Sequence, residues 1–196
     1  MEPVTAKEPR AQEVLAFWFG EGAERGKPRK AWFEKNPAFD EEVRERFRAL
    51  HEDAAAGRLS DWRERAAECL ALVIVLDQFP RNMFRDTSRA FATDPLALET
   101  AKYAVARGLD TGMSPVERLF LYLPFEHSES LDDQWQALAL IAPLAAWPET
   151  ADVFHYAVRH WEVIRRLGRF PHRNAVLSRA STPEEIEFLK TPGSRF

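Results

Sequence analysis

The stretch "VFHYAVRHWEVIRRLG", residues 153–168, decides the fold class of this chain. Its apolar side chains recur at spacings of three and four residues, which places them along one stripe of an α-helix. The stripe consists of Val153, Phe154, Ala157, Trp161 and Ile164. Charged residues fall on the opposite face, as in a helix that buries one side. We therefore predict an amphipathic helix over residues 150–167.

The same spacing continues through almost the whole chain, and no stretch shows the alternating pattern or the hairpin turns of β-strands. The sequence therefore predicts an all-α protein. We expect about eight helices, over residues 8–19, 40–56, 64–78, 94–108, 115–123, 131–146, 150–167 and 183–190. The connections are mostly short, which favours antiparallel neighbours in a helical bundle or a stack of helical hairpins.

Two helix boundaries carry local signals. In "STPEEIEFLK", Thr182 is the expected N-cap, Pro183 the first helical residue and Glu185 the partner that completes a capping box. Asp40 is the expected N-cap of the second helix, and Gly57 is the expected residue just past its end.

Composition limits the classes of protein. A chain of 196 residues without a low-complexity linker predicts a single domain over residues 1–196. A net charge of −4 argues against nucleic-acid binding, which needs a basic face. The single cysteine, Cys69, lies in an apolar run and is expected in the core of a protein from a reducing compartment. With no signal-peptide pattern and no apolar segment long enough for a membrane, we expect a cytoplasmic protein.

Three motifs that combine a proline with polar residues follow predicted helices. They are "LDQFPRN" at 76–82, "LPFEHSE" at 123–129 and "GRFPHRN" at 168–174, after the third, fifth and seventh helices. If successive helices run up and down, these three helix ends lie on the same side of the molecule. The residues thus brought together are Asp77, Gln78, Arg81, Asn82, Glu126, His127, Ser128, Glu129, His172, Arg173 and Asn174.

A purely structural interpretation of these motifs remains open. Proline stops a helix, because it lacks an N–H group and crowds the preceding turn. Cations and asparagine next to a helix C-terminus are ordinary capping groups. Pairs between Arg81 or Arg173 and Asp77 or Glu129 would hold the loops together without any ligand.

The functional interpretation is a site for a small molecule. Arg81 and Arg173 are candidates to hold an anionic group, because a guanidinium binds carboxylate or phosphate with two hydrogen bonds. The further candidate ligand-binding residues are Asn82, Asn174, Gln78 and Ser128. His127 or His172, oriented by Asp77 or Glu129, are the candidates for acid–base catalysis, because histidine titrates near neutral pH.

Other chemistries lack support in the sequence. The spacing of His127, Glu129 and His172 matches no strong metal-ligand pattern, so no metal is predicted. There is neither a phosphate-binding loop nor a dinucleotide fingerprint, and no cofactor is implied. The remaining histidines, which we expect on solvated or half-buried helix faces, are left out of the site: His51, His155 and His160.

Five motifs resemble the domain-of-unknown-function family 924. They are "LAFWFG", "LDQFPRNMFR", "PFEHSE", "GRFPHRN" and "TPEEIEFL", and they run from about residue 14 to 189. The resemblance implies an all-α fold similar to tetratricopeptide-like helical proteins. It implies no activity, cofactor or substrate, so no residue role can be carried over from it.

Two functions therefore remain. The first is the binding of a small anionic molecule at the converging helix ends, with its turnover as an extension of that function. The second is a tetratricopeptide-like interaction module for a peptide or protein partner, in which the polar motifs only brace the loops. A closed polar pocket would favour the first and an exposed aromatic surface the second. If the chain forms an oligomer, a symmetric homodimer is the commonest form.

Overall fold

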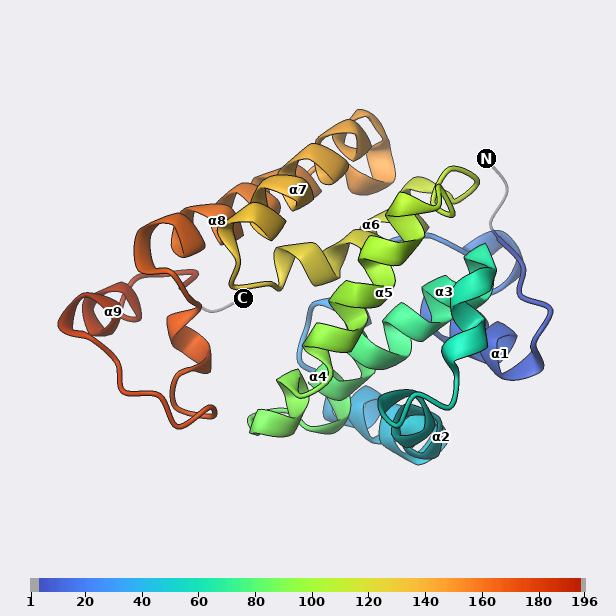
Figure 1. Ribbon diagram of the computed structural model, residues 1–196, viewed down its shortest axis with the longest axis horizontal. Helices are drawn as coiled ribbons and strands as arrows, with labels where there is room; N and C mark the ends of the chain where they lie inside the picture. Colours follow the sequence, from blue (N-terminus) through green and yellow to red (C-terminus); the bar gives the residue numbers. More distant parts are fainter. Residues whose placement is uncertain (1–3, 195–196) are drawn as a thin grey trace.

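The computed structural model describes residues 4–194, and within them every regular element is helical, which confirms the predicted all-α class (Figure 1). The α-helices are α1 (Pro9–Phe19), α2 (Pro37–Ala55), α3 (Ala66–Val73), α4 (Phe79–Met83), α5 (Asp94–Ala106), α6 (Pro115–Glu126), α7 (Leu131–Ile141), α8 (Val153–Leu167) and α9 (Pro183–Phe188). The short helical turns used below are η4 (Ile74–Gln78), η5 (Ser88–Phe91) and η8 (Pro171–Arg173).

The centre of the molecule is one unbroken helical run formed by α3, η4 and α4. It packs against α1, α2, α5 and α6, so its apolar residues are buried on all sides rather than along one stripe. Cys69 lies in this run without solvent contact, as predicted, and burial raises the pKa of its thiol to about 12. The core therefore forms around residues 66–83.

The helical run passes through Pro80, so our prediction that the third helix stops at residue 78 was wrong. A proline inside a helix removes one N–H donor and crowds the carbonyl four residues earlier, which here belongs to Leu76. The chain accommodates it by widening into a π-helix, η4, just before the proline.

Three carbonyl groups of η4 accept hydrogen bonds from side chains. His51 Nδ1 donates to the Val75 carbonyl at 3.1 Å, the Thr93 hydroxyl to the Leu76 carbonyl at 2.6 Å, and Arg81 to the Asp77 carbonyl at 2.5 Å. Buried carbonyls are costly to leave without donors, so these contacts make the proline tolerable.

The second proline motif also lies inside a helix, because α6 continues through Pro124 to Glu126 and not only to residue 123. The third motif behaves as predicted. The helix α8 ends at Leu167, and Gly168 follows it with a left-handed φ of +72°. Pro171 then begins the short turn η8.

The predicted helix caps are partly confirmed. Thr182 and Glu185 form the capping box at the start of α9. Gly57 lies just beyond α2 with a φ of +75°. The N-cap of α2, however, is Asn36 and not Asp40, because α2 begins at a proline three residues earlier than predicted.

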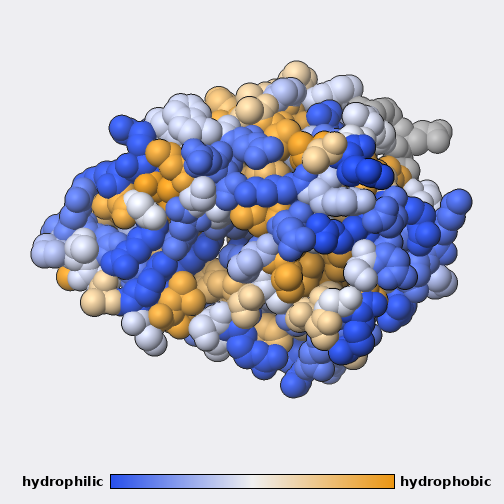
Figure 2. All heavy atoms as spheres, in the orientation of Figure 1, coloured by the Kyte–Doolittle hydropathy of each residue, from blue (hydrophilic) through white to orange (hydrophobic). Residues whose placement is uncertain are grey.

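The C-terminal part forms a separate layer. The helices α7 and α8 lie side by side, and α9 with the following segment lies against the end of α8 (Figure 1). A small second core consists of Val163, Ile164 and Phe170, against which Leu167 and Phe188 pack. The face seen in Figure 2 is mostly hydrophilic, with hydrophobic side chains in separate patches. No helix within residues 4–194 has the length and apolar character that a membrane crossing requires.

Candidate functional site

The first and second polar motifs meet at Asp77 and His127. Asp77 lies in η4 and His127 directly follows α6, and His127 Nδ1 is 2.8 Å from Asp77 Oδ1. Asp77 is fully buried, and Arg81 Nη1 lies 3.2 Å from the same carboxylate oxygen. Burial alone would raise the pKa of Asp77, but the Arg81 cation and His127 lower it to about 2. Asp77 is therefore an ionised carboxylate that orients His127.

Arg81 connects this pair to the start of α5. Its guanidinium binds Asp94 with two hydrogen bonds, from Nη1 to Oδ1 at 2.9 Å and from Nη2 to Oδ2 at 3.0 Å. It also lies over the Phe91 ring, 5.6 Å from the centroid. Asp94 was missed in the sequence, because an aspartate next to a proline at the start of a helix is an ordinary initiation signal.

Arg173 brings the third motif to the same place. Its guanidinium contacts two aromatic rings, 4.8 Å from the Phe91 centroid and 4.5 Å from the Phe170 centroid. Only 6% of the residue is exposed, and its Nη1 is 3.5 Å from Asp94 Oδ2. The buried Nε has no hydrogen-bond acceptor among the described residues. Burial and the nearby Arg81 cation lower the pKa of Arg173 to about 10.

A second carboxylate–histidine pair lies beside the first. His160 Nδ1 is 2.9 Å from Glu126 Oε1 and 2.9 Å from the Tyr156 carbonyl. The His160 ring lies 6.4 Å from the ring of His127. His160 is only 6% exposed, so our expectation of a solvated or half-buried face was wrong.

His51 is also buried, contrary to that expectation, but its Nδ1 binds the backbone of η4. Only His155 of the three histidines left out of the site is exposed. The helical spacing indicates which side of a helix faces inward, but it does not show that an inward-facing histidine finds a carboxylate.

His172 completes the group, next to Arg173 in η8. Its side chain is partly buried, and its ring lies 5.7 Å from the Phe170 ring. Burial, and then the Arg173 cation, lower the pKa of His172 to about 3. We call the following residues the His–Arg cluster: Asp77, Arg81, Asp94, Glu126, His127, His160, His172 and Arg173.

Two predicted site residues are bound in neighbouring networks. Glu129 accepts hydrogen bonds from Arg179 at 2.6 and 3.0 Å and from the Phe170 N–H at 2.8 Å. These contacts join the start of α7 to the segment after α8. Asn174 donates to Ser181 and to Glu185, which holds it against the start of α9.

The remaining predicted residues have local partners. Gln78 donates to the Asp77 carboxylate. Asn82 donates to Asp40 at 2.7 Å on the side that faces α2. The Ser128 hydroxyl donates to Asp133 at 2.8 Å in the first turn of α7. Proximity along a motif therefore did not place all of its side chains in one site.

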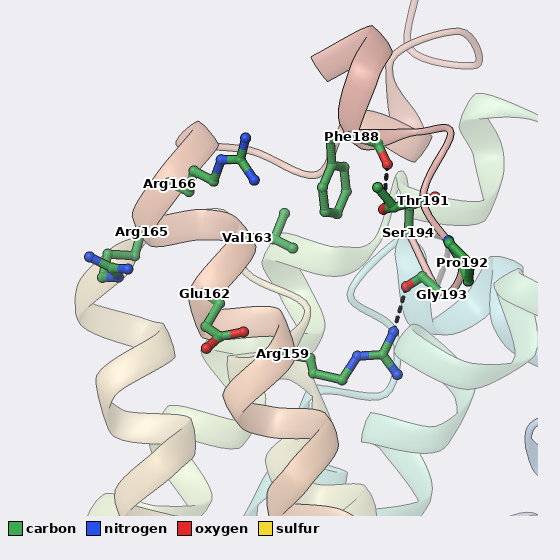
Figure 3. A pocket seen from close by; sticks show the side chains of 10 residues that line it. All are labelled: Arg159, Glu162, Val163, Arg165, Arg166, Phe188, Thr191, Pro192, Gly193 and Ser194. Atoms are coloured by element: carbon green, nitrogen blue, oxygen red, sulfur yellow. Dashed lines mark hydrogen bonds between the residues drawn. The ribbon is translucent and has the colours of Figure 1, made fainter. Parts of the chain in front are cut away.

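Two pockets lie away from the cluster. The first, of about 290 Å³, lies between α8 and residues 188–194. Figure 3 shows Arg159 reaching from α8 to the Gly193 carbonyl, whereas Arg165 points away from that segment. The second, of about 400 Å³, lies behind η4 and is lined in part by His51 and Thr93.

The cluster does not have the donor arrangement of a metal centre. Within residues 4–194, no group of three or more histidine, cysteine, aspartate or glutamate side chains is placed to hold a metal ion. The two guanidinium groups of the cluster would also repel a cation. Guanidinium groups are suited to bind anions, and imidazole rings to transfer protons.

Comparisons with known proteins identify a family for the chain but assign no activity to it. The model of the family DUF924, described as a bacterial protein of unknown function, matches residues 14–193. The chain is similar to a solved structure, the protein of unknown function ATU0120 from Agrobacterium tumefaciens. The two are 42% identical, with a TM-score of 0.82 over 92% of this chain and 97% of the other. No curated protein matches the chain significantly.

Proposed function

The chain belongs to the DUF924 family, and we propose that it binds a small carboxylate or phosphate anion at Arg173 in the His–Arg cluster. The proposal rests on one observation: Arg173 is buried, but its guanidinium is incompletely paired. A buried cation normally has well-placed carboxylate partners, because charge is costly to bury unpaired. Arg173 has an ion pair of 3.5 Å and a buried Nε without an acceptor among the described residues.

The surroundings of Arg173 suit an anion. Contacts with the Phe91 and Phe170 rings restrict the movement of the guanidinium, so its donors are oriented before a ligand arrives. Arg81 lies close enough to lower the pKa of Arg173, and an anion would relieve that repulsion. Asp94 already occupies the carboxylate-binding edge of Arg81, which leaves Arg173 as the main anchor.

We extend the proposal to acid–base chemistry on the bound anion. Asp77 holds His127 at Nδ1, and Glu126 holds His160 at Nδ1. In the His127 ring, Nε2 is then the nitrogen that would exchange a proton with the ligand. Glu129, the other predicted orienting carboxylate, is engaged with Arg179, so Asp77 and Glu126 are the better candidates for that role.

Ligand-induced stabilisation tests the anion site. Thermal unfolding would be followed with sulfate, phosphate, acetate and succinate, at an ionic strength matched with sodium chloride. An anion at one hundred times its dissociation constant should stabilise the wild type by about 2.7 kcal/mol. Arg173→Gln should lose this stabilisation.

Arg166→Gln is the matched control, because Arg166 is an exposed arginine beside the pocket of Figure 3. It should keep the full response to the anion. If Arg166→Gln loses the response while Arg173→Gln keeps it, the anion binds at the surface pocket and the proposal is wrong. The same holds if none of the four anions stabilises the wild type.

The alternative is a tetratricopeptide-like interaction module, and one exposed aromatic pair favours it. Trp135 on α7 is 54% exposed, and its ring lies 4.9 Å from that of Trp161 on α8. A second copy of this chain is the simplest partner. Light scattering should then show a concentration-dependent dimer that Trp135→Ser abolishes. A monomer at all concentrations would exclude this form of the module.

A further inference from the structure

We infer that the pocket behind η4 binds a small organic carboxylate that carries an N–H or O–H group close to its carboxylate. Arg89 holds the carboxylate, and His51 Nε2 accepts the hydrogen bond from the neighbouring group. The pocket has a volume of about 400 Å³ and is lined by side chains from residues 51–56 and 84–93. The inference does not depend on the anion site proposed at Arg173.

His51 presents a hydrogen-bond acceptor to this pocket. Its Nδ1 lies 3.1 Å from the Val75 carbonyl, and because a carbonyl can only accept, the proton of the neutral ring is on Nδ1. Nε2 then keeps its lone pair, and no side chain or backbone group within residues 4–194 donates to it. Burial, aided by the Arg89 cation, lowers the pKa of His51, which keeps the ring neutral.

Arg89 presents a cation to the same pocket. Its guanidinium lies over the Phe84 ring, with Cζ 3.8 Å from the ring centroid. Among the described residues, the guanidinium has neither an ion pair nor a hydrogen bond. An arginine that is stacked on a ring, with its N–H donors unused, is well placed to bind a carboxylate with two hydrogen bonds.

Phe84 places the cation and the acceptor next to each other. The centroid of its ring lies 5.7 Å from that of His51, and the same ring carries the Arg89 guanidinium. One small molecule can therefore reach both groups if its carboxylate and its donor are a few bonds apart. Glu52 also lines the pocket, but Arg48 binds its carboxylate at 3.1 Å and compensates its charge.

The remaining walls of the pocket suit an apolar body. They include the methyl groups of Ala55, Ala56 and Ala92. Thr93 also lines the pocket, but its hydroxyl donates to the Leu76 carbonyl at 2.6 Å, so this proton is not offered to a ligand. A mostly apolar pocket of this volume with a few polar groups is typical of small-molecule sites. The ligand class is therefore a hydroxy or amino acid with an apolar side chain.

Calorimetric titration of the full chain tests the ligand class with three probes of similar shape: phenyllactate, phenylalanine and hydrocinnamate. Hydrocinnamate has the carboxylate but no donor beside it, so it should bind about three- to tenfold more weakly than the better of the other two. Binding of phenyllactate alone would identify the donor as a hydroxyl group, and binding of phenylalanine alone would identify it as an amine.

Arg89→Gln should weaken the binding of the donor-bearing probes about tenfold or more, because it removes the charged hydrogen bonds to the carboxylate. Arg89 is exposed, so the variant should fold, which circular dichroism would verify. Arg107→Gln is the matched control. Arg107 is also exposed and lies over an aromatic ring, that of Tyr103, but it does not line the pocket. This control should bind the probes as the wild type does.

Nitrogen NMR of the imidazole rings tests the role of His51 in the wild type, because substituting His51 would also remove a donor to η4. Without ligand, the proton of His51 should be on Nδ1. Phenyllactate or phenylalanine should shift the Nε2 signal, and hydrocinnamate should shift it much less. A proton on Nε2 in the free protein would overturn the inference.

The binding results can also contradict it. The inference is wrong if neither donor-bearing probe binds the wild type, if hydrocinnamate binds as tightly as both, or if Arg89→Gln binds as the wild type does. If Arg173→Gln loses the binding while Arg89→Gln keeps it, the probe occupies the His–Arg cluster and the pocket behind η4 is not its site. Unchanged binding to Arg173→Gln would support two separate sites.

Discussion

Replacing His172 by glutamine should make the protein more resistant to mild acid. The pKa of His172 in the folded protein is lowered from 6.5 to about 3 by burial and by the Arg173 cation. Between these two values the unfolded chain binds a proton at this position and the folded protein does not. Stability is therefore lost as the pH falls below 6.5, and it is fully present above that value.

The size of the effect follows from the two pKa values. On lowering the pH from 7 to 5, His172 should remove about 2 kcal/mol of unfolding free energy, a loss that His172→Gln avoids. Burial also lowers the pKa values of His51 and His127. They contribute in both proteins, so their effect cancels in the difference.

Urea unfolding followed by circular dichroism at pH 7 and pH 5 measures this difference. His155→Gln is the control for the substitution itself, because His155 is an exposed histidine on α8. If His172→Gln loses as much stability between pH 7 and pH 5 as the wild type, then His172 is not held neutral by its surroundings. That result would refute the conclusion that burial and the Arg173 cation lower the pKa of His172.

Three further substitutions test the network around η4 and the C-terminal layer. Thr93→Val removes the donor to a buried carbonyl of η4 and should cost about 1–3 kcal/mol in urea unfolding, whereas the exposed Thr87→Val should cost almost nothing. Asp77→Asn should cost about 3–5 kcal/mol at pH 7, because it removes the buried carboxylate that pairs with the Arg81 cation. The lowered pKa of Asp77 stabilises the fold above pH 4, and this contribution is lost towards pH 2. The unfolding free energy of the variant should therefore fall less steeply than that of the wild type between pH 4 and pH 2. Glu129→Gln should cost about 2 kcal/mol through its charged hydrogen bonds, and an unchanged midpoint would show that these bonds do not brace the layer.

The fold class was predictable because helical periodicity depends only on the spacing of apolar residues within a short stretch of chain. The apolar residues identified in this way then pack together in the core. The capping box of Thr182 and Glu185 was also predictable, since both of its partners lie within one turn of the chain. The order of the helices was enough to indicate that the three polar motifs meet. Asp77 and His127, 50 positions apart, are in direct contact.

The contents of the cluster were less predictable, because they depend on the direction of side chains from six different elements: η4, α4, α5, α6, α8 and η8. Asp94 bridges Arg81 and Arg173, although its own sequence context indicates only the start of a helix. His160 looks like an ordinary helical residue until Glu126 on the neighbouring helix is placed beside it. Such pairings are set by packing between helices, and periodicity within one helix does not contain them.

The largest local error of the sequence-based prediction coincides with the site. The rule that proline ends a helix fails at Pro80, where the chain adopts a π-helix whose carbonyls accept hydrogen bonds from the side chains of His51, Thr93 and Arg81. If the helix ended at residue 78, Arg81 would lie in a loop and could turn towards solvent. Continued helix instead places Arg81 one turn after Asp77, where it binds both that residue and Asp94. A costly backbone feature that fixes charged side chains in a buried place is more readily explained by a function there than by stability, since a regular apolar helix would fold at lower cost.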